Sequence, residues 1–258
     1  MREYFVQAGY GVRFEWGPAG ARHLAPEVAA LVVVDVLSFT TSVSVAVETG
    51  ARVFPYAWRD ESAETFARSR DAELAVGRSA VSVRTPWSLS PAALRRAPAT
   101  PRLVLPSPNG SAIAAPAHGA GAQVVAGCLR NGGAVGRWLA ERGYGRRERP
   151  VGVVAAGERW PDGSLRPALE DLLGAGAVIA ALRGRGCGPL SPEAAMAATA
   201  HASCADVARE VGQSVSGREL AEGGFGADVA IAVELDASEV VPVLIDGAFA
   251  EAGNSPEN

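Results

Sequence analysis

A run of four apolar residues that ends on a carboxylate constrains the fold of this chain most. Residues 31–34 are rich in valine, as a buried strand is, and Asp35 follows them directly. Hydroxyl residues come next, and an apolar segment then runs into Glu48 and ends at Gly50, which predicts a helix. In open α/β sheets, ligands bind beyond the carboxyl ends of the strands. Asp35 is therefore a candidate for holding a cation or a proton, and the alternative is that it caps the following helix.

Three further strand–turn–helix units follow along the chain. Their predicted strands begin at Leu103, Ala122 and Val151, and each ends in small or polar residues before a helical segment. Strands that alternate with helices imply crossover connections and a sheet covered on both faces. We therefore expect a three-layer α/β/α fold with a largely parallel or mixed central sheet. No composition break marks a linker, so residues 1–250 are expected to form a single domain, followed by a flexible tail at 251–258.

The segments that flank these strand–turn–helix units show weaker sequence patterns. Residues 10–16 alternate apolar and polar side chains, which predicts a half-buried strand, and residues 61–70 predict a polar helix. Residues 228–234 and 240–244 are interpreted as strands. The stretch at 60–100, which contains prolines, is either a flap over a site or an ordinary connection, and long loops often carry function.

The basic residues are all arginine, with 24 of them and no lysine. This excludes a Schiff-base lysine and a phosphate loop of the Walker type, so anions must be bound by arginine forks, backbone amides or a metal. The net charge of −4 and the lack of a basic block argue against nucleic-acid binding.

The three cysteines fit no zinc spacing and indicate a reducing compartment. No apolar run approaches the roughly 20 residues of a membrane span, and no signal-peptide pattern opens the sequence, so we expect a cytoplasmic protein that does not bind membranes.

Polar residues follow the second and third predicted strands. Asn109, Gly110 and Ser111 lie at a helix start, where backbone amides and a hydroxyl can bind an anion; a capped turn is the alternative. Arg130 and Asn131 follow the third strand. Arginine supplies a bidentate fork for phosphate, sulfonate or carboxylate, and a salt bridge to a neighbouring acid is equally open.

The fourth unit carries the most acidic loop and helix start. Glu158 and Arg159 follow the strand, and Glu170 and Asp171 lie in the first turns of a helix that begins near Pro167. Glu170 and Asp171 would lie about 100 degrees apart around the helix axis, so one is expected to face the crevice while the other meets solvent. The helix dipole favours acids at this position, which makes a structural role the default for one of them.

These segments resemble those of the 2-phosphosulfolactate phosphatase family, which comprises magnesium-dependent acid phosphatases that form sulfolactate on the route to coenzyme M. The matching segments occur in order over residues 30–248: V-D-V-L and T-T at 34–41, S-P-N-G-S at 107–111, L-R-N at 129–131, A-G at 156–157, and L-E-D-L at 169–172. Carboxylates, arginines and a hydroxyl-rich helix start fit such chemistry, since Mg²⁺ takes oxygen ligands and needs only one or two carboxylates.

The resemblance implies a role for each candidate residue. Asp35, Glu170 and Asp171 would hold Mg²⁺ and serve catalysis, with Asp35 either a metal ligand or a nucleophile. A small anionic phosphorylated substrate would be bound by the remaining candidates, which are Arg78, Asn109, Gly110, Ser111, Arg130, Asn131, Glu158 and Arg159. A homodimer is expected because related proteins often form one.

The chain departs from the family pattern at two places. Ser38 stands where the family has an arginine, and residues 77–91 keep only parts of two family motifs. These positions shape the anionic pocket, so three alternatives stay open. The chain could be a phosphatase for a different phosphorylated acid, a non-catalytic protein that binds small anions on the same scaffold, or an enzyme for lyase or isomerase chemistry with the same metal.

Overall fold

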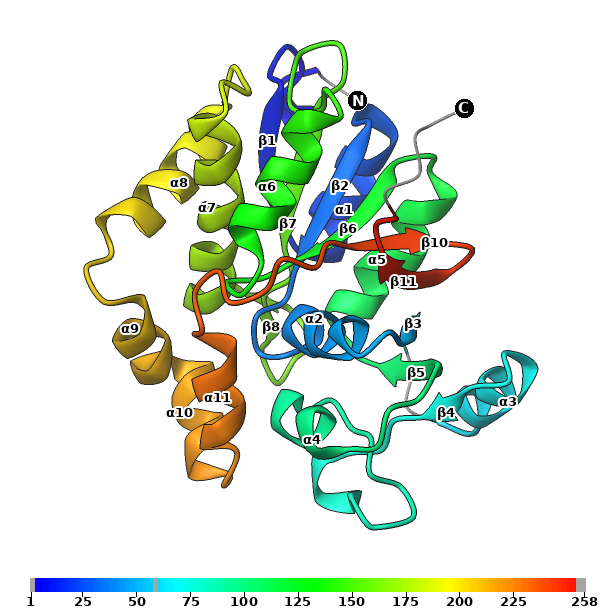
Figure 1. Cartoon of the computed structure of the whole chain (residues 1–258). Helices are drawn as coiled ribbons and strands as arrows, with labels where there is room; N and C mark the ends of the chain where they lie inside the picture. Colours follow the sequence, from blue (N-terminus) through cyan, green and yellow to red (C-terminus); the bar gives the residue numbers. More distant parts are fainter. Residues whose placement is uncertain (1–2, 58–59, 254–258) are drawn as a thin grey trace.

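Valine-rich strands form the centre of the molecule. The computed structural model describes residues 3–57 and 60–253. Within them, nine strands form one mixed sheet in the order β1-β7-β2-β6-β10-β11-β3-β5-β4 (Figure 1). The strands are β1 (Val12–Trp16), β2 (Ala30–Val34), β3 (Arg52–Tyr56), β4 (Glu73–Leu74), β5 (Arg102–Pro106), β6 (Gln123–Gly127), β7 (Val151–Ala155), β10 (Pro242–Ile245) and β11 (Ala248–Glu251).

Two parallel blocks make up this sheet. Strands β1, β7, β2 and β6 pair in parallel, and so do β3, β5 and β4. The antiparallel hairpin of β10 and β11 joins the blocks, because β10 pairs with β6 and β11 with β3. The expectation of a three-layer α/β/α fold with a mixed central sheet is confirmed.

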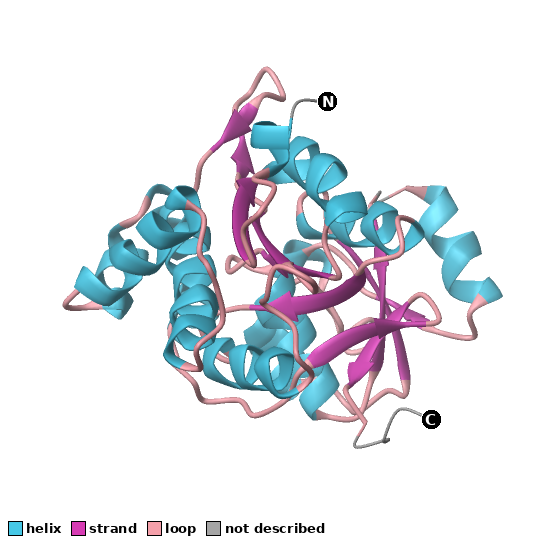
Figure 2. Ribbon diagram, turned by 90° about the horizontal axis from the view of Figure 1, so that it is seen from above, coloured by secondary structure: helices cyan, strands magenta, loops and turns pink. Residues whose placement is uncertain are grey.

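Helices cover both faces of the sheet (Figures 1 and 2). Helices α1 (Gly17–Leu24), α2 (Phe39–Glu48) and α5 (Gly110–Gly119) pack on one face, and α6 (Gly132–Glu141), α7 (Leu169–Gly184) and α8 (Pro192–Ser203) pack on the other. The remaining helices are α3 (Glu61–Ser69), α4 (Pro91–Arg96), α9 (Val207–Gln213), α10 (Val215–Glu222) and α11 (Gly226–Ala232), and a short 3-10 turn spans Arg78–Ala80. Residues 158–159 and 165–166 form a small separate ribbon of β8 and β9.

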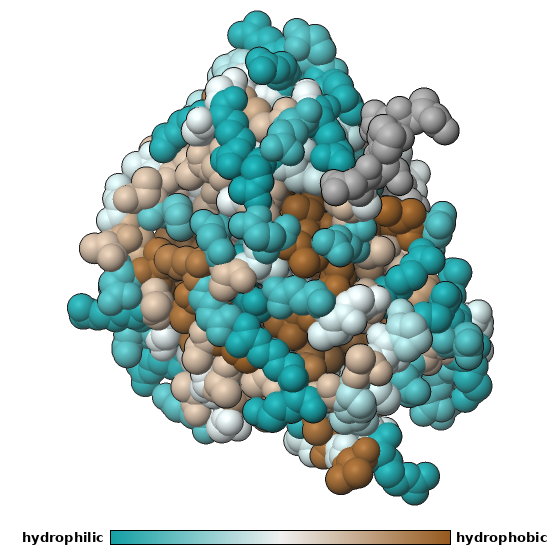
Figure 3. Space-filling model, viewed as in Figure 1, coloured by the Kyte–Doolittle hydropathy of each residue, from teal (hydrophilic) through white to brown (hydrophobic). Residues whose placement is uncertain are grey.

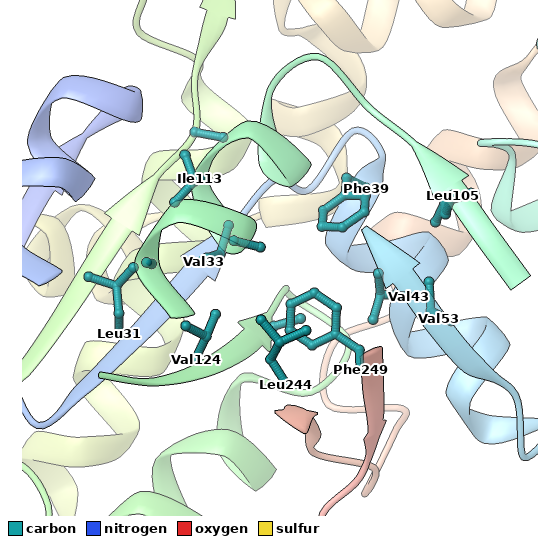
Figure 4. Packing of buried hydrophobic residues seen from close by; sticks show 14 of the residues in the cluster. Leu31, Val33, Phe39, Val43, Val53, Leu105, Ile113, Val124, Leu244 and Phe249 are labelled. Atoms are coloured by element: carbon teal, nitrogen blue, oxygen red, sulfur yellow. The ribbon is translucent and has the colours of Figure 1, made fainter. Parts of the chain in front are cut away.

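Burial on both faces explains the unbroken apolar run of β2. Leu31 and Val33 belong to the core on the α1, α2 and α5 face, where Figure 4 shows Leu31 and Val33 with Phe39 and Phe249. Val32 and Val34 belong to the opposite core, with α6, α7 and α8. Because successive side chains of a strand point to opposite faces, both sets must be apolar. On the outer surface seen in Figure 3, apolar residues are interspersed among polar ones.

Several expectations for the flanking segments are confirmed. Residues 10–16 contain β1, whose last two residues are half-buried, and residues 61–70 contain α3. Residues 240–244 overlap β10. Within the described residues, no helix combines the length and apolar character needed to cross a bilayer.

Two expectations for the end of the chain need correction. Residues 228–234 were expected to form a strand, but most of them belong to α11, whose Val229, Ile231 and Ala232 are buried. A short apolar run does not distinguish a strand from a buried helix. A flexible tail was expected at 251–258, but Glu251 is the last residue of β11, and residues 254–258 lie outside the described part.

Candidate active site

A cavity of about 250 Å³ opens where the chain leaves β2, β5 and β7. The loops after these strands form its floor, the segment at 78–89 forms one wall, and α10 forms another. The residues that line it are Asp35, Leu37, Ser38, Arg78, Leu89, Ser107, Pro108, Asn109, Glu158, Ser216, Glu219 and Leu220. Strand β5 belongs to the other parallel block, yet its loop reaches Asp35 directly, because Gly110 N donates to Asp35 Oδ2 at 2.8 Å.

Backbone groups hold Asp35 at the cavity floor. Its Oδ1 accepts from Phe39 N at 3.1 Å, and its own N–H donates to Thr40 Oγ1 at 3.0 Å. The N-cap of α2 is Ser38, and Asp35 accepts from the first N–H group of the helix, that of Phe39, while it also faces the cavity. Burial raises the pKa of Asp35, while the N–H groups of Phe39 and Gly110 oppose this shift. Each carboxylate oxygen keeps one acceptor site for a ligand.

Glycine is required next to this carboxylate. A Cβ atom on Gly110 would lie 2.4 Å from Phe39 Cδ1 and 2.8 Å from Asp35 Oδ2. Any larger residue would push the ring and the carboxylate apart. The candidate residue Gly110 thus positions Asp35 through its N–H group.

Asp171 ties two of the floor loops together. Its Oδ1 accepts from Val36 N at 2.7 Å and its Oδ2 accepts from Gly157 N at 2.8 Å. The loops after β2 and β7 are therefore anchored on the same side chain of α7. Burial raises the pKa of Asp171 well above its usual value, and the nearby charges of Asp35 and Glu170 add to this.

Glu170 lies beside these groups and not in solvent. The expectation that one of Glu170 and Asp171 meets solvent is wrong, because both are buried, at 1% and 3% exposed. Helix α7 packs against α6, α8 and the sheet, and Glu170 and Asp171 both lie on its packed sides, while Leu169 of the same turn is exposed. Glu170 Oε2 is buried without a hydrogen-bond partner among the described residues. The negative charge of Glu170 raises the pKa of Asp35, Asp171 and Glu158.

Glu158 is the fourth acid of this group and lines the cavity. Its Oε2 accepts from Asn109 Nδ2 at 2.9 Å. Burial raises the pKa of Glu158 to about 7, and the charge of Asp35 adds to this shift. Arg159 is exposed and reaches back to the same loop, donating from Nε to Asn109 Oδ1 at 3.4 Å.

Arg78 enters the cavity from a segment distant in sequence. Its Nη2 donates to Ser38 Oγ at 2.7 Å, and its Nε donates to Asp228 Oδ2 at 3.1 Å. Asp228 is fully buried and also accepts from Ser90 Oγ at 2.5 Å. Asp228 and the α10 residues of the cavity wall were not expected at the site. The sequence also resembles the family at Asp228, and this likeness is the only sequence signal for that residue.

Three of the candidate residues outside the cavity lining make structural contacts elsewhere in the fold. The buried guanidinium of Arg130 pairs with Glu48 at 3.0 Å and with Glu234 at 3.6 Å, which is the salt-bridge alternative. Asn131 accepts from Cys128 N at 2.8 Å, and Ser111 Oγ donates to the carbonyl of Leu105 at 3.3 Å. These contacts are structural, so the phosphate-binding role expected for these residues does not fit their positions.

The acidic group suits a divalent cation held by fewer than three side chains. Over residues 3–57 and 60–253, no cluster of three or more His, Cys, Asp or Glu residues is arranged as a metal site. Asp171 does not line the cavity, and both of its oxygens accept backbone N–H groups, so Asp171 acts as an anchor. Asp35 and the unpartnered Glu170 Oε2 remain as hard oxygen donors, and Mg²⁺ needs only one or two carboxylates because it keeps several waters.

Comparison with known proteins identifies the family. Residues 20–247 match the family model described as 2-phosphosulpholactate phosphatase. The chain belongs to this family. No curated protein matches the chain by sequence. The match to the 2-phosphosulpholactate phosphatase family includes β2, β5 and β7 and all residues that line the cavity.

Proposed function

We propose that this chain is a Mg²⁺-dependent phosphatase that hydrolyses a small phosphate monoester in the cavity. The observation that carries the proposal is Asp35, fixed by two backbone N–H groups at the floor and flanked by the buried Glu170 and the half-buried Glu158. Three acids this close repel one another, and a cation would relieve that repulsion. The family name supports a phosphoric monoester hydrolase.

Each group at the site has a role in this proposal. Asp35 and Glu170 would hold Mg²⁺, which would neutralise charge on the phosphoryl oxygens and activate a water molecule. Arg78 faces the cavity with Nη groups that can bind a phosphate oxygen. Asn109 orients Glu158, and Glu158 is the cavity-lining acid available for proton transfer to the departing alcohol oxygen.

A phosphate-release assay tests the proposal. Phosphate release from 2-phosphosulfolactate and from simpler monoesters should require Mg²⁺, stop with EDTA, and fall at least about 100-fold in Asp35→Asn. Glu222→Gln is a matched control, because Glu222 is exposed on α10 and pairs with Arg218 at 3.3 Å. Full activity of Asp35→Asn, or release that is insensitive to EDTA, would contradict the mechanism. Acid-quench trapping of a phosphoenzyme would assign Asp35 as the nucleophile and not as a metal ligand.

The proposal extends to the pathway, the cellular location and the oligomeric state of the protein. If 2-phosphosulfolactate is the substrate, the product is sulfolactate on the route to coenzyme M, and the enzyme would work in the cytoplasm. Light scattering on the purified chain checks the proposed homodimer.

A non-catalytic protein that binds small anions is the second candidate. The observation that favours it is Ser38, which stands where the family has an arginine and here accepts a hydrogen bond from Arg78. Tight binding of phosphate esters without any phosphate release would support this candidate.

A further inference from the structure

An arginine beside the cavity has no acidic partner. Arg166 is half-buried at the end of β9, and no carboxylate of the described residues forms an ion pair with it. Within the described residues its side chain donates a single hydrogen bond, from Nη2 to Ser216 Oγ at 3.1 Å, and its Cζ lies 5.9 Å from the centre of the Trp160 ring. A guanidinium has five N–H donors, so most of those on Arg166 can still bind a ligand.

The ribbon of β8 and β9 brings Arg166 to the side of the cavity. Arg166 lies directly opposite Glu158 in this antiparallel ribbon, and residues paired in this way have their side chains on the same face. Glu158 lines the cavity, and so does Ser216 of α10, the hydrogen-bond partner of Arg166. The charge of Arg166 lowers the pKa of Glu158, but burial has the larger effect and raises that pKa to about 7. Glu158 therefore offsets the charge of Arg166 only in part, and its Oε2 accepts from Asn109 instead.

The base of this ribbon is fixed to the cavity floor. Gly157 precedes β8 and donates its N–H group to Asp171 Oδ2 at 2.8 Å. A Cβ atom on Gly157 would lie 2.7 Å from Leu165 Cδ1 and 3.0 Å from the carbonyl oxygen of Arg166. The backbone of β9 thus packs directly against a glycine that Asp171 anchors. Arg166 is therefore positioned by the same side chain that holds the loops after β2 and β7.

The other positive charges of the site already have partners. Mg²⁺, held as proposed by Asp35 and Glu170, would offset the charges of these acids and bind phosphoryl oxygens. The guanidinium of Arg78 pairs with the buried carboxylate of Asp228 at 3.1 Å. Arg166 has no such carboxylate, so its charge remains for a second anionic group. The planar fork of a guanidinium matches the oxygens of a carboxylate or a sulfonate.

We propose that Arg166 binds a second acidic group of the substrate, a carboxylate or a sulfonate, and so makes the enzyme selective for acidic phosphate esters. This rests on the proposed phosphatase function and assigns its substrate selectivity to one residue. The phosphoryl group would bind at the metal on the floor, and the second acidic group would bind where the ribbon of β8 and β9 meets α10. A cavity of about 250 Å³ suits a substrate with few carbon atoms between these two groups.

Two esters of similar size separate selectivity from a structural role of Arg166. Phosphoglycolate ends in a carboxylate, and ethylene glycol monophosphate ends in a hydroxyl. In wild type, kcat/KM for phosphoglycolate should be at least about tenfold higher, as expected for hydrogen bonds to a charged group. Arg166→Gln should remove this preference, mainly through the KM of phosphoglycolate, and should change kcat/KM for the hydroxyl ester by less than about threefold. Arg166→Lys keeps the charge without the fork and should keep only part of the preference.

Arg68→Gln is the matched control. Arg68 is exposed on α3, where it pairs with Glu64 at 3.7 Å, and it does not line the cavity. This variant loses the same charge as Arg166→Gln and should keep the full preference for phosphoglycolate.

The outcomes distinguish this proposal from the proposed function. An equal loss of kcat/KM for both esters in Arg166→Gln would show a structural role and overturn the proposal, and so would a preference that this variant retains. If Arg166→Gln does not fold, Arg166→Lys decides, and an unchanged preference there overturns the proposal. If no ester releases phosphate, the phosphatase proposal fails, and calorimetric Kd values with Mg²⁺ then test Arg166 alone. Phosphoglycolate should bind Arg166→Gln at least about tenfold more weakly than wild type; equal binding, or none to either protein, refutes the role of Arg166.

Discussion

Replacement of Glu158 by glutamine should stabilise the protein at neutral and alkaline pH in the absence of metal. Glutamine keeps an oxygen that can accept the hydrogen bond from Asn109 Nδ2, and it removes a charge that is buried near Asp35 and Glu170. The pKa of Glu158 is raised from 4.5 to about 7, mainly by burial. The folded chain therefore binds the Glu158 proton more tightly than the unfolded chain does.

The change in the free energy of unfolding caused by Glu158→Gln depends on pH. Well below pH 4.5 the carboxyl is protonated in both states, and the substitution should change the free energy of unfolding little. As the pH rises from 4.5 through about 7, the unfolded chain ionises first and the wild-type protein loses stability. Above that range the loss reaches roughly 3 kcal/mol, since a tenfold change in proton binding is worth about 1.4 kcal/mol. For a chain of this size this corresponds to roughly 6 to 12 °C in Tm.

Thermal unfolding at several pH values in EDTA measures this difference. The Tm of Glu158→Gln should equal that of wild type near pH 4.5 and exceed it increasingly up to pH 8. Glu222→Gln should follow wild type throughout, because Glu222 is exposed. Addition of Mg²⁺ should stabilise wild type more than Glu158→Gln, since the cation offsets the buried charge. A Tm difference that is absent, or constant with pH, would refute the argument.

Three further substitutions test other parts of the site. Gly110→Ala should lower stability by about 1–3 kcal/mol and reduce kcat, because its methyl group would displace Asp35; urea unfolding and steady-state kinetics measure both. Asp228→Asn should raise KM several-fold with a smaller change in kcat, because Arg78 loses the partner that fixes it. Arg130→Met should cost about 1–3 kcal/mol of stability and leave KM unchanged, because Arg130 pairs with two glutamates outside the cavity.

Each of these substitutions has an outcome that contradicts its reasoning. Wild-type kcat in Gly110→Ala would show that the floor tolerates a larger residue. An unchanged KM in Asp228→Asn would remove Arg78 from substrate binding. A raised KM in a folded Arg130→Met protein would restore the phosphate-binding role that the structure argues against.

The sequence predicted the layers of the fold and the position of its central acid. The apolar run at 31–34 and its counterpart at 151–155 are buried on both faces of the sheet, so their composition alone marks them as central strands. Residues that follow such strands, as Asp35 and Glu158 do, reach the cavity because strand ends position them. These predictions depend on local patterns only.

The remaining features depend on contacts between distant segments. Arg78 and Asp228 are 150 residues apart, and α11 carries Asp228 to both Arg78 and the start of α4, where Ser90 and Ala92 also donate to it. From the sequence, Arg130 could bind a phosphate or form a salt bridge with an acid. The fold brings Glu48 next to Arg130, and the two residues form a salt bridge. Glu170 and Asp171 are both buried because neighbouring elements cover two adjacent sides of α7, which its own sequence did not reveal.

The division of the cavity between sheet loops and α10 has an evolutionary consequence. The floor carries the reacting acids, and Asp171 binds the backbone that follows β2 and β7. Mutations in the floor should therefore lower both the activity and the stability of the protein. The α10 wall is a short helix with partly exposed side chains, and few of its contacts support the core. Descendants of this protein could thus exchange Glu219 or Leu220 and acquire new substrates while the catalytic machinery stays intact.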